Sequence, residues 1–487
     1  MTAAHTKLIN FPMIIRVIGF LLIIEGVFML TVVPVEWYFE GYSHNLMLIS
    51  AAITLVIGSL FFFSTAKINK TLSKREGYII VSFAWVITSL FGALPYLLQE
   101  DMPSFTDAFF ETMSGFTTTG ATILTDIESM PKALLFWRSL THWIGGMGII
   151  MLSVAILPIL GIGGFQLFMA EVPGVTYDKI HPRITSTSKN LWAIYVLFTF
   201  IQFVLLWAGE MNWFDAVNHS FSTMSTGGFS TRNNSVAAYG IYSQYIIIAF
   251  MIIAGTNFTL HYFALHGQLR KAIKNEEFRG YLGIIFVLSL FFTFILVLSD
   301  QRIEQAFRES IFTVVSVLTT TGFVTVDYLS WPVLMWVLVF LLMFIGGSAG
   351  STSGGMKVIR QMLLIKNAWM ELKRAIHPNA VLPVKFNGKS VSRDIIFKVM
   401  AFFLMYIMLF VVGMLLLVVI GLDFETAIGA SIASIGNIGP AIGQLGPTAN
   451  YALLPDIAKW VLSFLMMLGR LELFTVMILF SPHFWRQ

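Results

Sequence analysis

The sequence predicts an all-α membrane protein that crosses the lipid bilayer many times. Of its 487 residues, 57% are hydrophobic and only 11% are charged, and the mean hydropathy is +0.80. Soluble domains average about 45–50% apolar and about 25% charged residues, so this chain has too little polar surface to cover a soluble body. Two further observations agree: apolar runs of roughly 20 residues, enough to cross a bilayer, recur along the chain, and one short pattern is repeated four times.

Ten apolar segments are predicted to be full membrane spans. They lie near residues 12–33, 45–65, 78–98, 134–162, 191–209, 241–265, 280–299, 332–364, 394–421 and 456–481.

The basic residues predict the orientation of these spans, because cytoplasmic loops collect Lys and Arg. The loops after the second, fourth, sixth and eighth spans are rich in both, whereas each alternate loop holds at most two. We therefore expect both termini in the cytoplasm.

Composition also excludes several kinds of site. The chain has no cysteine, so it has neither disulfides nor thiolate metal sites. Its histidines, including His142, His219 and His261, show no metal-ligand spacing. The net charge of +4 is spread over short loops between spans, so we expect no nucleic-acid partner.

Four of the predicted outside segments share one pattern. Each holds a moderately apolar stretch of about 12 residues, too short to span, followed by a Gly-rich tip. The tips read Thr117-Thr118-Thr119-Gly120-Ala121, Ser225-Thr226-Gly227-Gly228-Phe229, Thr319-Thr320-Thr321-Gly322-Phe323 and Gly436-Asn437-Ile438-Gly439-Pro440.

We align the tips on Gly120, Gly228, Gly322 and Gly439. Fifteen positions before these glycines stand four aromatic residues, Phe105, Trp213, Phe307 and Phe424. Aligning the second tip on Gly227 instead would put Asn212 at the aromatic position. A repeat inside one sequence indicates repeated architecture.

The predicted unit is a span, a re-entrant half-helix, a Gly tip and a second span, occurring four times around one pseudo-fourfold pore. The predicted divisions are two extra N-terminal spans (1–76) and pore repeats at 77–165, 166–279, 280–375 and 376–487.

Such a unit is suited to cations. Non-helical backbone at membrane depth is tolerated where it lines water or is buried in protein. Four tips around one axis would turn carbonyl oxygens inward to replace an ion's hydration shell, and each inward-running half-helix would present its negative C-terminal end. The candidate filter residues are Thr118, Thr119, Gly120, Thr226, Gly227, Gly228, Thr320, Thr321, Gly322, Asn437, Ile438 and Gly439. The alternative is that these are ordinary Gly/Thr loops of a membrane enzyme or scaffold.

The chain is similar to a known family. The likeness rests on these tips, a Gly-rich interruption of the eighth span, Gly-Arg-Leu-Glu in the last span and two extra N-terminal spans. It resembles the Trk, Ktr and HKT superfamily of potassium transporters, and most closely the bacterial Trk-type membrane subunit. The resemblance implies a filter that binds potassium ions at its carbonyls, with no covalent cofactor. In plant relatives a serine at the first filter glycine accompanies sodium preference, so Gly120 favours potassium here.

The eighth span is interrupted by residues 346–355, and each glycine there costs a helix roughly 1 kcal/mol. We predict an intramembrane loop that obstructs the pore, as the resemblance implies. Its expected gating residues are Gly346, Gly347, Gly350, Gly354, Gly355 and Lys357. The alternative is a cytoplasmic linker after a shorter span.

The last span carries Arg470 and Glu472, and a charge at this depth is by default functional. The resemblance implies that Arg470 faces the pore near the loop and acts as an electrostatic barrier. A structural ion pair with another span is the alternative. Pairing between these two residues is not expected, because positions i and i+2 point to different sides of a helix. Glu111 and Arg138 are expected to be structural, although Glu111 could instead draw cations to the outer mouth.

The resemblance further implies a homodimer in the bacterial inner membrane, surrounded by lipid, with a separate cytoplasmic ring of nucleotide-binding regulatory subunits. The basic loops could instead serve only topology and contact with anionic lipid. A sodium- or proton-coupled potassium symporter is the second interpretation, and a polytopic membrane enzyme is a distant third.

Overall fold

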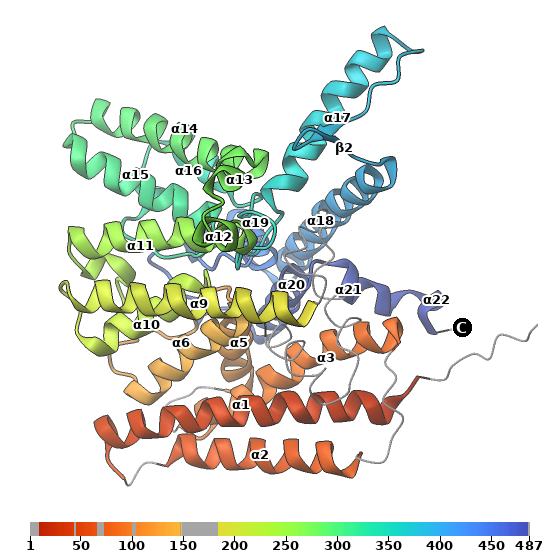
Figure 1. The fold of residues 1–487 in the computed structure, drawn as a ribbon. Helices are drawn as coiled ribbons and strands as arrows, with labels where there is room; N and C mark the ends of the chain where they lie inside the picture. Colours follow the sequence, from red (N-terminus) through yellow and green to blue (C-terminus); the bar gives the residue numbers. More distant parts are fainter. Residues whose placement is uncertain are drawn as a thin grey trace, which may run out of the picture.

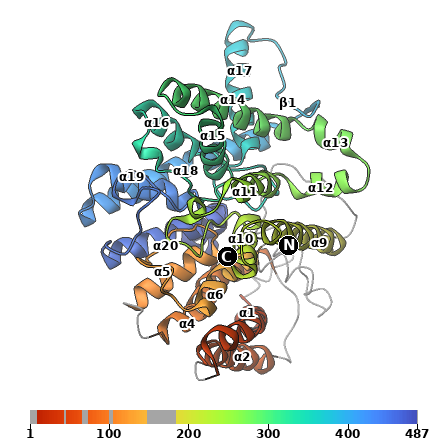
Figure 2. The ribbon, with the colours of Figure 1, turned by 90° about the vertical axis from the view of Figure 1, so that its left-hand side faces the viewer.

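The protein is described by a computed structural model that covers residues 9–42, 45–65, 73–99, 104–146, 148 and 184–485. Figures 1 and 2 show a helical molecule in which α1 and α2 lie side by side at one end and α14, α16 and α17 lie at the other. Four short helices, α5, α10, α15 and α19, lie in the body between these ends.

The described helices follow one another along the chain. They are α1 (Phe11–Glu40), α2 (Leu46–Ser64), α3 (Lys74–Gly92), α4 (Leu94–Leu97), α5 (Phe105–Phe116), α6 (Lys132–Gly146), α9 (Ile184–Trp207), α10 (Trp213–Met224), η1 (Ser235–Ala238), α11 (Ile241–Ala254), α12 (Phe258–Leu265), α13 (Leu269–Lys274), α14 (Glu276–Leu298), α15 (Ile303–Leu318), η2 (Tyr328–Ser330), α16 (Val333–Leu342), α17 (Val358–Ile376), α18 (Arg393–Ile420), α19 (Phe424–Ile435), η3 (Gly443–Leu445), α20 (Asp456–Arg470), α21 (Phe474–Met477), η4 (Ile478–Phe480) and α22 (Pro482–Trp485).

Six of the described helical stretches are long and apolar enough to cross a bilayer, and the number rises to eight if each of two bent pairs is one span. This is fewer than the ten predicted spans. The eighth predicted span is interrupted between α16 and α17, and most of the second half of the fourth, 147–162, lies outside the described residues.

The sixth span, predicted as continuous over 241–265, is broken in the structure. Its two helices, α11 and α12, meet at 100°. The second helix starts at Asn257, whose side chain accepts a hydrogen bond from the Thr259 N–H at 2.8 Å. The Gly255 carbonyl at the break accepts from the Ser348 N–H at 2.9 Å, and the Phe258 N–H donates to the Gly350 carbonyl at 2.9 Å. The break therefore makes room for the 346–355 segment and hydrogen-bonds to it.

The last span, predicted as continuous over 456–481, bends by 110° after α20. Glu472 and Leu473 both have a φ of +55°. The Phe474 N–H donates to the Glu472 carbonyl at 2.6 Å, so Leu473 is the centre of a γ-turn, a rare and strained conformation. The Glu472 carboxylate forms an ion pair with Arg360 at the start of α17, so tertiary contact, and no glycine or proline, holds this bend.

The four short helices share an end point relative to the aligned glycines. Each ends four residues before its glycine. Three of them, α5, α10 and α19, begin at the aligned aromatic residue, and their N-cap side chains, on Ser104, Asn212 and Asp423, accept a hydrogen bond from the third helical N–H. The third helix, α15, starts one turn earlier at Ile303.

The prediction of a purely α-helical chain needs one small correction. Residues Lys385–Phe386 (β1) and Lys389–Ser390 (β2) pair as a two-stranded antiparallel hairpin. Asn387 and Gly388 join the strands with φ values of +49° and +74°, the turn chemistry that favours a two-residue hairpin.

Candidate ion filter and adjoining loop

The four aligned tips have the same backbone conformation. Two residues before each glycine, φ is +52° at Thr118, +54° at Thr226, +56° at Thr320 and +53° at Asn437. The aligned glycines have φ values of +78° to +90° (Gly120, Gly228, Gly322 and Gly439). A threonine with positive φ is a conformational outlier, so the same strain at one position of four segments marks a constrained structure. The torsions also agree with aligning the second tip on Gly228.

Each tip closes the helix before it in the same way. In the first, the Thr118 N–H donates to the Gly115 carbonyl at 3.0 Å and the Thr119 N–H donates to the Ser114 carbonyl at 2.9 Å. The same pair of bonds, at 2.8–3.1 Å, recurs at the ends of α10, α15 and α19. This is the Schellman pattern, and it leaves the negative ends of four helix dipoles at the tips.

The four tips lie against one another in a closed ring. A Cβ added to Gly120 would stand 2.2 Å from the carbonyl oxygen of Gly227, in the second tip. A Cβ on Gly228 would stand 2.0 Å from the Thr321 oxygen, and one on Gly322 would stand 1.9 Å from the Ile438 oxygen. One on Gly439 would stand 2.6 Å from the Thr119 oxygen, which returns to the first tip. Each filter glycine thus faces the carbonyl of the residue that precedes the filter glycine of the neighbouring tip. Glycine is required at all four positions, because φ is positive there and a Cβ would collide with that carbonyl.

Side-chain hydrogen bonds also stabilise the tips. Thr117 and Thr119 pair through their hydroxyls at 2.8 Å, and Thr319 and Thr321 do the same at 2.7 Å. In the fourth tip the Asn437 amide donates to Thr119 Oγ1 at 3.0 Å and to the Met466 carbonyl at 2.8 Å. All twelve predicted filter residues thus lie in one ring.

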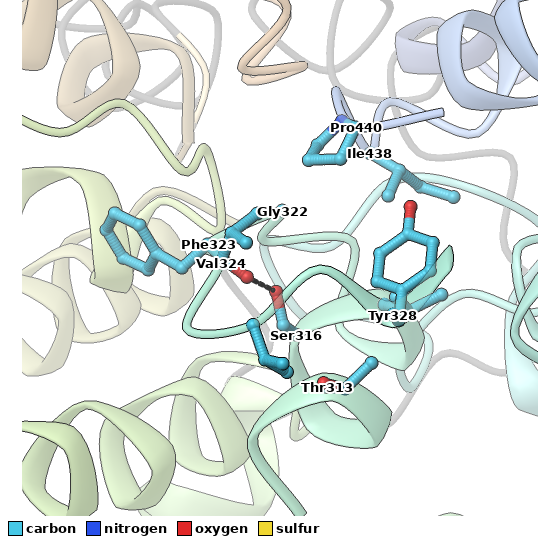
Figure 3. A pocket seen from close by; sticks show the side chains of 10 residues that line it. Thr313, Ser316, Gly322, Phe323, Val324, Tyr328, Ile438 and Pro440 are labelled. Atoms are coloured by element: carbon cyan, nitrogen blue, oxygen red, sulfur yellow. Dashed lines mark hydrogen bonds between the residues drawn. The ribbon is translucent and has the colours of Figure 1, made fainter. Parts of the chain in front are cut away.

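A small cavity of about 10 Å³ lies between the third and fourth tips (Figure 3). It is lined by Gly322, Phe323 and Ile438 among others, and Ser316 Oγ closes one side by donating to the Phe323 carbonyl at 2.7 Å. A space of this size holds no more than about one water molecule, so it is a packing gap behind the ring and not a ligand pocket.

The segment predicted as a gate, residues 346–355, lies directly against the ring. Gly354 donates its N–H to Thr320 Oγ1 at 2.7 Å, and Thr352 Oγ1 donates to the carbonyl of Met224, the last residue of α10, at 3.0 Å. A Cβ on Gly354 would stand 2.7 Å from the Gly436 oxygen. The loop therefore contacts the second, third and fourth tips or their helices.

The loop has a defined internal structure. Its two ends pair where the Gly346 N–H donates to the Met356 carbonyl at 2.8 Å and the Val358 N–H donates to the Gly347 carbonyl at 3.1 Å. Gly350 and Gly355 have φ values of +73° and +63°. The glycine-rich sequence of the loop did not predict this ordered pairing of its ends.

Charged side chains hold the loop. Lys357 turns its ammonium back to the Ser353 carbonyl. On the other side, Glu277 of α14, a residue the sequence analysis did not single out, accepts from the Ala349 N–H at 2.7 Å and from the Ile359 N–H at 3.2 Å. Its only sequence signal is a carboxylate at the start of an apolar span.

Arg470 connects the loop to the first repeat. Its Nη1 donates to the Thr352 carbonyl at 2.7 Å, and its Nη2 donates to the carbonyls of Gly145 and Gly146 at 2.5 and 2.8 Å. The guanidinium therefore lies among groups of α6, the loop and α20. Glu472 pairs with Arg360 and not with Arg470. Glu472 lies past the end of α20, so the helical i, i+2 spacing is not the reason.

A buried ion pair lies beside the first tip. Arg138 of α6 pairs with Glu111 of α5 at 2.6 Å, and both side chains are buried. Glu111 also accepts from the Ile123 N–H at 2.9 Å. Glu111 is therefore fully buried and paired, which agrees with a structural role and not with an exposed group that draws cations.

Polar contacts also join the segments that follow the first and second tips. Asn233 Nδ2 donates to Asp126 Oδ1 at 3.0 Å, and Arg232 pairs with Glu128 at 3.1 Å. The hydrogen bond from Asn233 holds the pKa of Asp126 below its ordinary value. These contacts fix the segment after the first tip to the segment after the second.

Comparisons with known proteins agree over nearly the whole chain. The family described as TrkH, a cation transport protein, matches residues 43–487. The chain is 41% identical to the Trk system potassium uptake protein TrkH of Escherichia coli (strain K12) in an alignment of 488 positions that covers 98% of this chain and 100% of the relative. It is 36% identical to the Trk system potassium uptake protein TrkG of the same strain over 494 residues, covering all of both chains.

A solved structure has the same fold. The crystal structure of the potassium transporter TrkH from Vibrio parahaemolyticus superposes with a TM-score of 0.88 at 39% sequence identity, and the match covers 98% of this chain and 100% of that one.

Proposed function

This chain belongs to the TrkH family of cation transport proteins, and we propose that potassium crosses the membrane through the ring formed by its four tips. The chain is a potassium uptake transporter of the Trk family with several apolar helices, and not an enzyme. Potassium is its transported substrate.

The observation that carries the proposal is the closed ring of glycines and carbonyls. The carbonyl oxygens of Thr119, Gly227, Thr321 and Ile438 each lie beside a glycine of a neighbouring tip. Backbone oxygens in a ring replace the hydration shell of a potassium ion. The four helix C-termini at the tips add negative potential. A transport protein without a cation filter would have no use for this arrangement.

The proposal extends to the gate. The 346–355 loop lies against the ring. Gly354 donates to Thr320 of the third tip, Thr352 donates to the end of α10, and Arg470 donates to the Thr352 carbonyl of the loop. A guanidinium there repels an approaching cation, and the loop occupies space next to the tips. We assign this arrangement to a closed pore, which opens when the bonds between Arg470 and the Thr352 carbonyl break.

We also propose the organisation inferred from the sequence: two N-terminal spans (1–76), four pore repeats and both termini in the cytoplasm of a bacterial inner-membrane homodimer. A cytoplasmic nucleotide-binding ring would act through α17, which carries the basic residues Lys366, Lys373 and Arg374 and extends away from the other helices (Figure 1). Sodium- or proton-coupled symport remains the alternative mechanism, and no described residue favours it.

The test is cation uptake into liposomes that contain the purified protein, with potassium, rubidium, sodium and lithium compared in parallel. We expect potassium and rubidium uptake well above that of sodium and lithium. Symport predicts that potassium uptake stops when sodium is absent and no proton gradient is applied. If no cation enters even when residues 346–355 are deleted, the pore proposal is wrong.

A further inference from the structure

The second tip lacks the brace found in two of the others. In the first and third tips, the residue before the filter glycine is a threonine, Thr119 or Thr321, whose hydroxyl pairs with a second threonine two residues earlier. The second tip has Ser225 and Gly227 at these positions. Something else has to hold its backbone in the shared conformation.

An imidazole ring from the first repeat occupies the missing position. A Cβ added to Gly227 would stand 2.2 Å from His142 Nδ1 and 2.4 Å from His142 Cγ. Gly227 does not have a positive φ, so no backbone torsion demands glycine there. The ring of His142, which is fully buried, explains why this tip alone has glycine before its filter glycine.

The His142 ring is itself held in place. It stacks on Phe229, the residue after Gly228, with ring centroids 3.9 Å apart and planes 13° apart. The guanidinium of Arg138 lies 3.5 Å from the centroid of the Phe229 ring, and it donates to Glu111 and to the Ser230 carbonyl at 2.9 Å.

His142 and Arg138 are four residues apart on α6, so they share a helix face. Both contact the aromatic side chain that follows the filter glycine. The stack therefore fixes the second tip to the first repeat.

We propose that His142 is a positioning residue for ion selection: its ring fixes the second tip and, with it, the Gly227 carbonyl. That carbonyl is the one that faces Gly120 of the first tip. A shift of this oxygen would change the size of the ring at one of its four sides, and filter selectivity depends on the geometry and number of coordinating oxygens. The inference rests on the proposed function, because it assigns a role within the same filter.

A positioning role for His142 and an ordinary buried role predict different results for its variants. A core residue would affect how much folded protein is obtained and how stable it is, and it would leave the ratio of rubidium to sodium uptake unchanged. A positioning residue changes that ratio in protein that is folded. Neither nitrogen of the His142 ring has a hydrogen-bond partner among the described residues, and the ring meets Gly227 and Phe229 through its flat shape. Phenylalanine should therefore replace histidine.

The experiment compares rubidium and sodium uptake in proteoliposomes for wild type, His142→Ala, His142→Phe, Gly227→Ala and the double variant H142A/G227A. We expect His142→Ala to lower the rubidium-to-sodium ratio roughly fivefold, which is about 1 kcal/mol, and His142→Phe to keep it within about twofold. Gly227→Ala should also lower the ratio, because its Cβ meets the ring. The double variant should recover part of this loss, since the ring is then absent.

Phe292→Ala is the matched control, because it removes a fully buried ring of α14 that belongs to no tip. It should lower the melting temperature and leave the ratio unchanged. An unselective wild type would show that the proposed function has failed. A selective wild type with an equally selective His142→Ala, or a double variant no better than Gly227→Ala, would overturn the role of His142 alone.

Discussion

Asn437 and Thr119, which are 318 positions apart, are joined by a hydrogen bond of 3.0 Å from the asparagine amide to the threonine hydroxyl. This bond connects the fourth tip to the first and lies beside the contact between Gly439 and the Thr119 carbonyl. The same amide bonds to the Met466 carbonyl of α20. A single side chain therefore links both ends of the ring to the last span.

Removing this amide should weaken the ring at that link. We expect Asn437→Ala to lower the rubidium-to-sodium uptake ratio by roughly fivefold, because a net loss of about 1 kcal/mol per hydrogen bond lets the fourth tip move away from the first. The ratio is measured as rubidium and sodium uptake into proteoliposomes. Asn450→Ala, in the outer loop after η3, is the control and should match wild type. A normal ratio in folded Asn437→Ala would contradict the role of the bond.

A side chain at the first filter glycine should disturb selection. Gly120→Ser forces a residue into φ +81° and puts its Cβ against the Gly227 carbonyl at 2.2 Å, so we expect at least a tenfold fall in potassium preference over sodium. The matched control is Gly41→Ser, since Gly41 has a φ of +82° with no atom within 4 Å of its Cβ position. That variant bears only the backbone cost, about 1 kcal/mol. If both variants select normally, the ring is not the filter.

Removing the Arg470 guanidinium should raise ion flux. Arg470→Ala loses the hydrogen bonds to the Thr352, Gly145 and Gly146 carbonyls and one positive charge next to the ring, which frees the loop and lowers the barrier to a cation. We expect potassium uptake to rise several-fold, since each 1.4 kcal/mol of barrier is about a factor of ten. Arg470→Lys keeps the charge and should give an intermediate rate. Uptake equal to wild type in both variants would exclude the barrier.

The ion pair between Arg360 and Glu472 should stabilise the bend in the last span. Its side chains are 5% and 17% exposed, and breaking a buried pair leaves one charge without its partner, which costs about 3 kcal/mol. We expect Glu472→Gln to lower the melting temperature in detergent by several degrees. Glu371→Gln breaks an exposed pair with Arg374 and should have almost no effect. Equal melting temperatures for the two variants would contradict a structural role for the Arg360–Glu472 pair.

The sequence predicted well those features that are set by local rules. Aligning four glycines predicted where the four short helices end, because a Schellman turn needs fixed spacing between a helix end and its positive-φ residues. The capping side chains Ser104, Asn212 and Asp423 agree with the aligned helix starts. The early start of α15 was not predicted, because Arg302 gives no side-chain cap.

Features formed by contacts between residues far apart in the sequence were not predicted. The bend after Arg470 is formed by Glu472 and Leu473, residues with no turn propensity, and it follows from pairing with Arg360 over a hundred positions away. His142 was considered only for metal binding, and its place behind Gly227 needs the first repeat to pack on the second. Gly227 was the one feature of the sequence that could have indicated this contact. Its role becomes clear only when the His142 ring is seen against it.

The closing contact of the ring also matters during biosynthesis. The first tip meets the fourth through residues 119, 437 and 439, so a ribosome has made about nine-tenths of the 487-residue chain before those groups can touch. Every shorter nascent chain holds at most three tips, and three tips cannot enclose an ion. If the ring is the proposed ion path, a half-made protein already inserted in the bilayer has no completed filter, and we expect conduction to begin only when translation is almost complete.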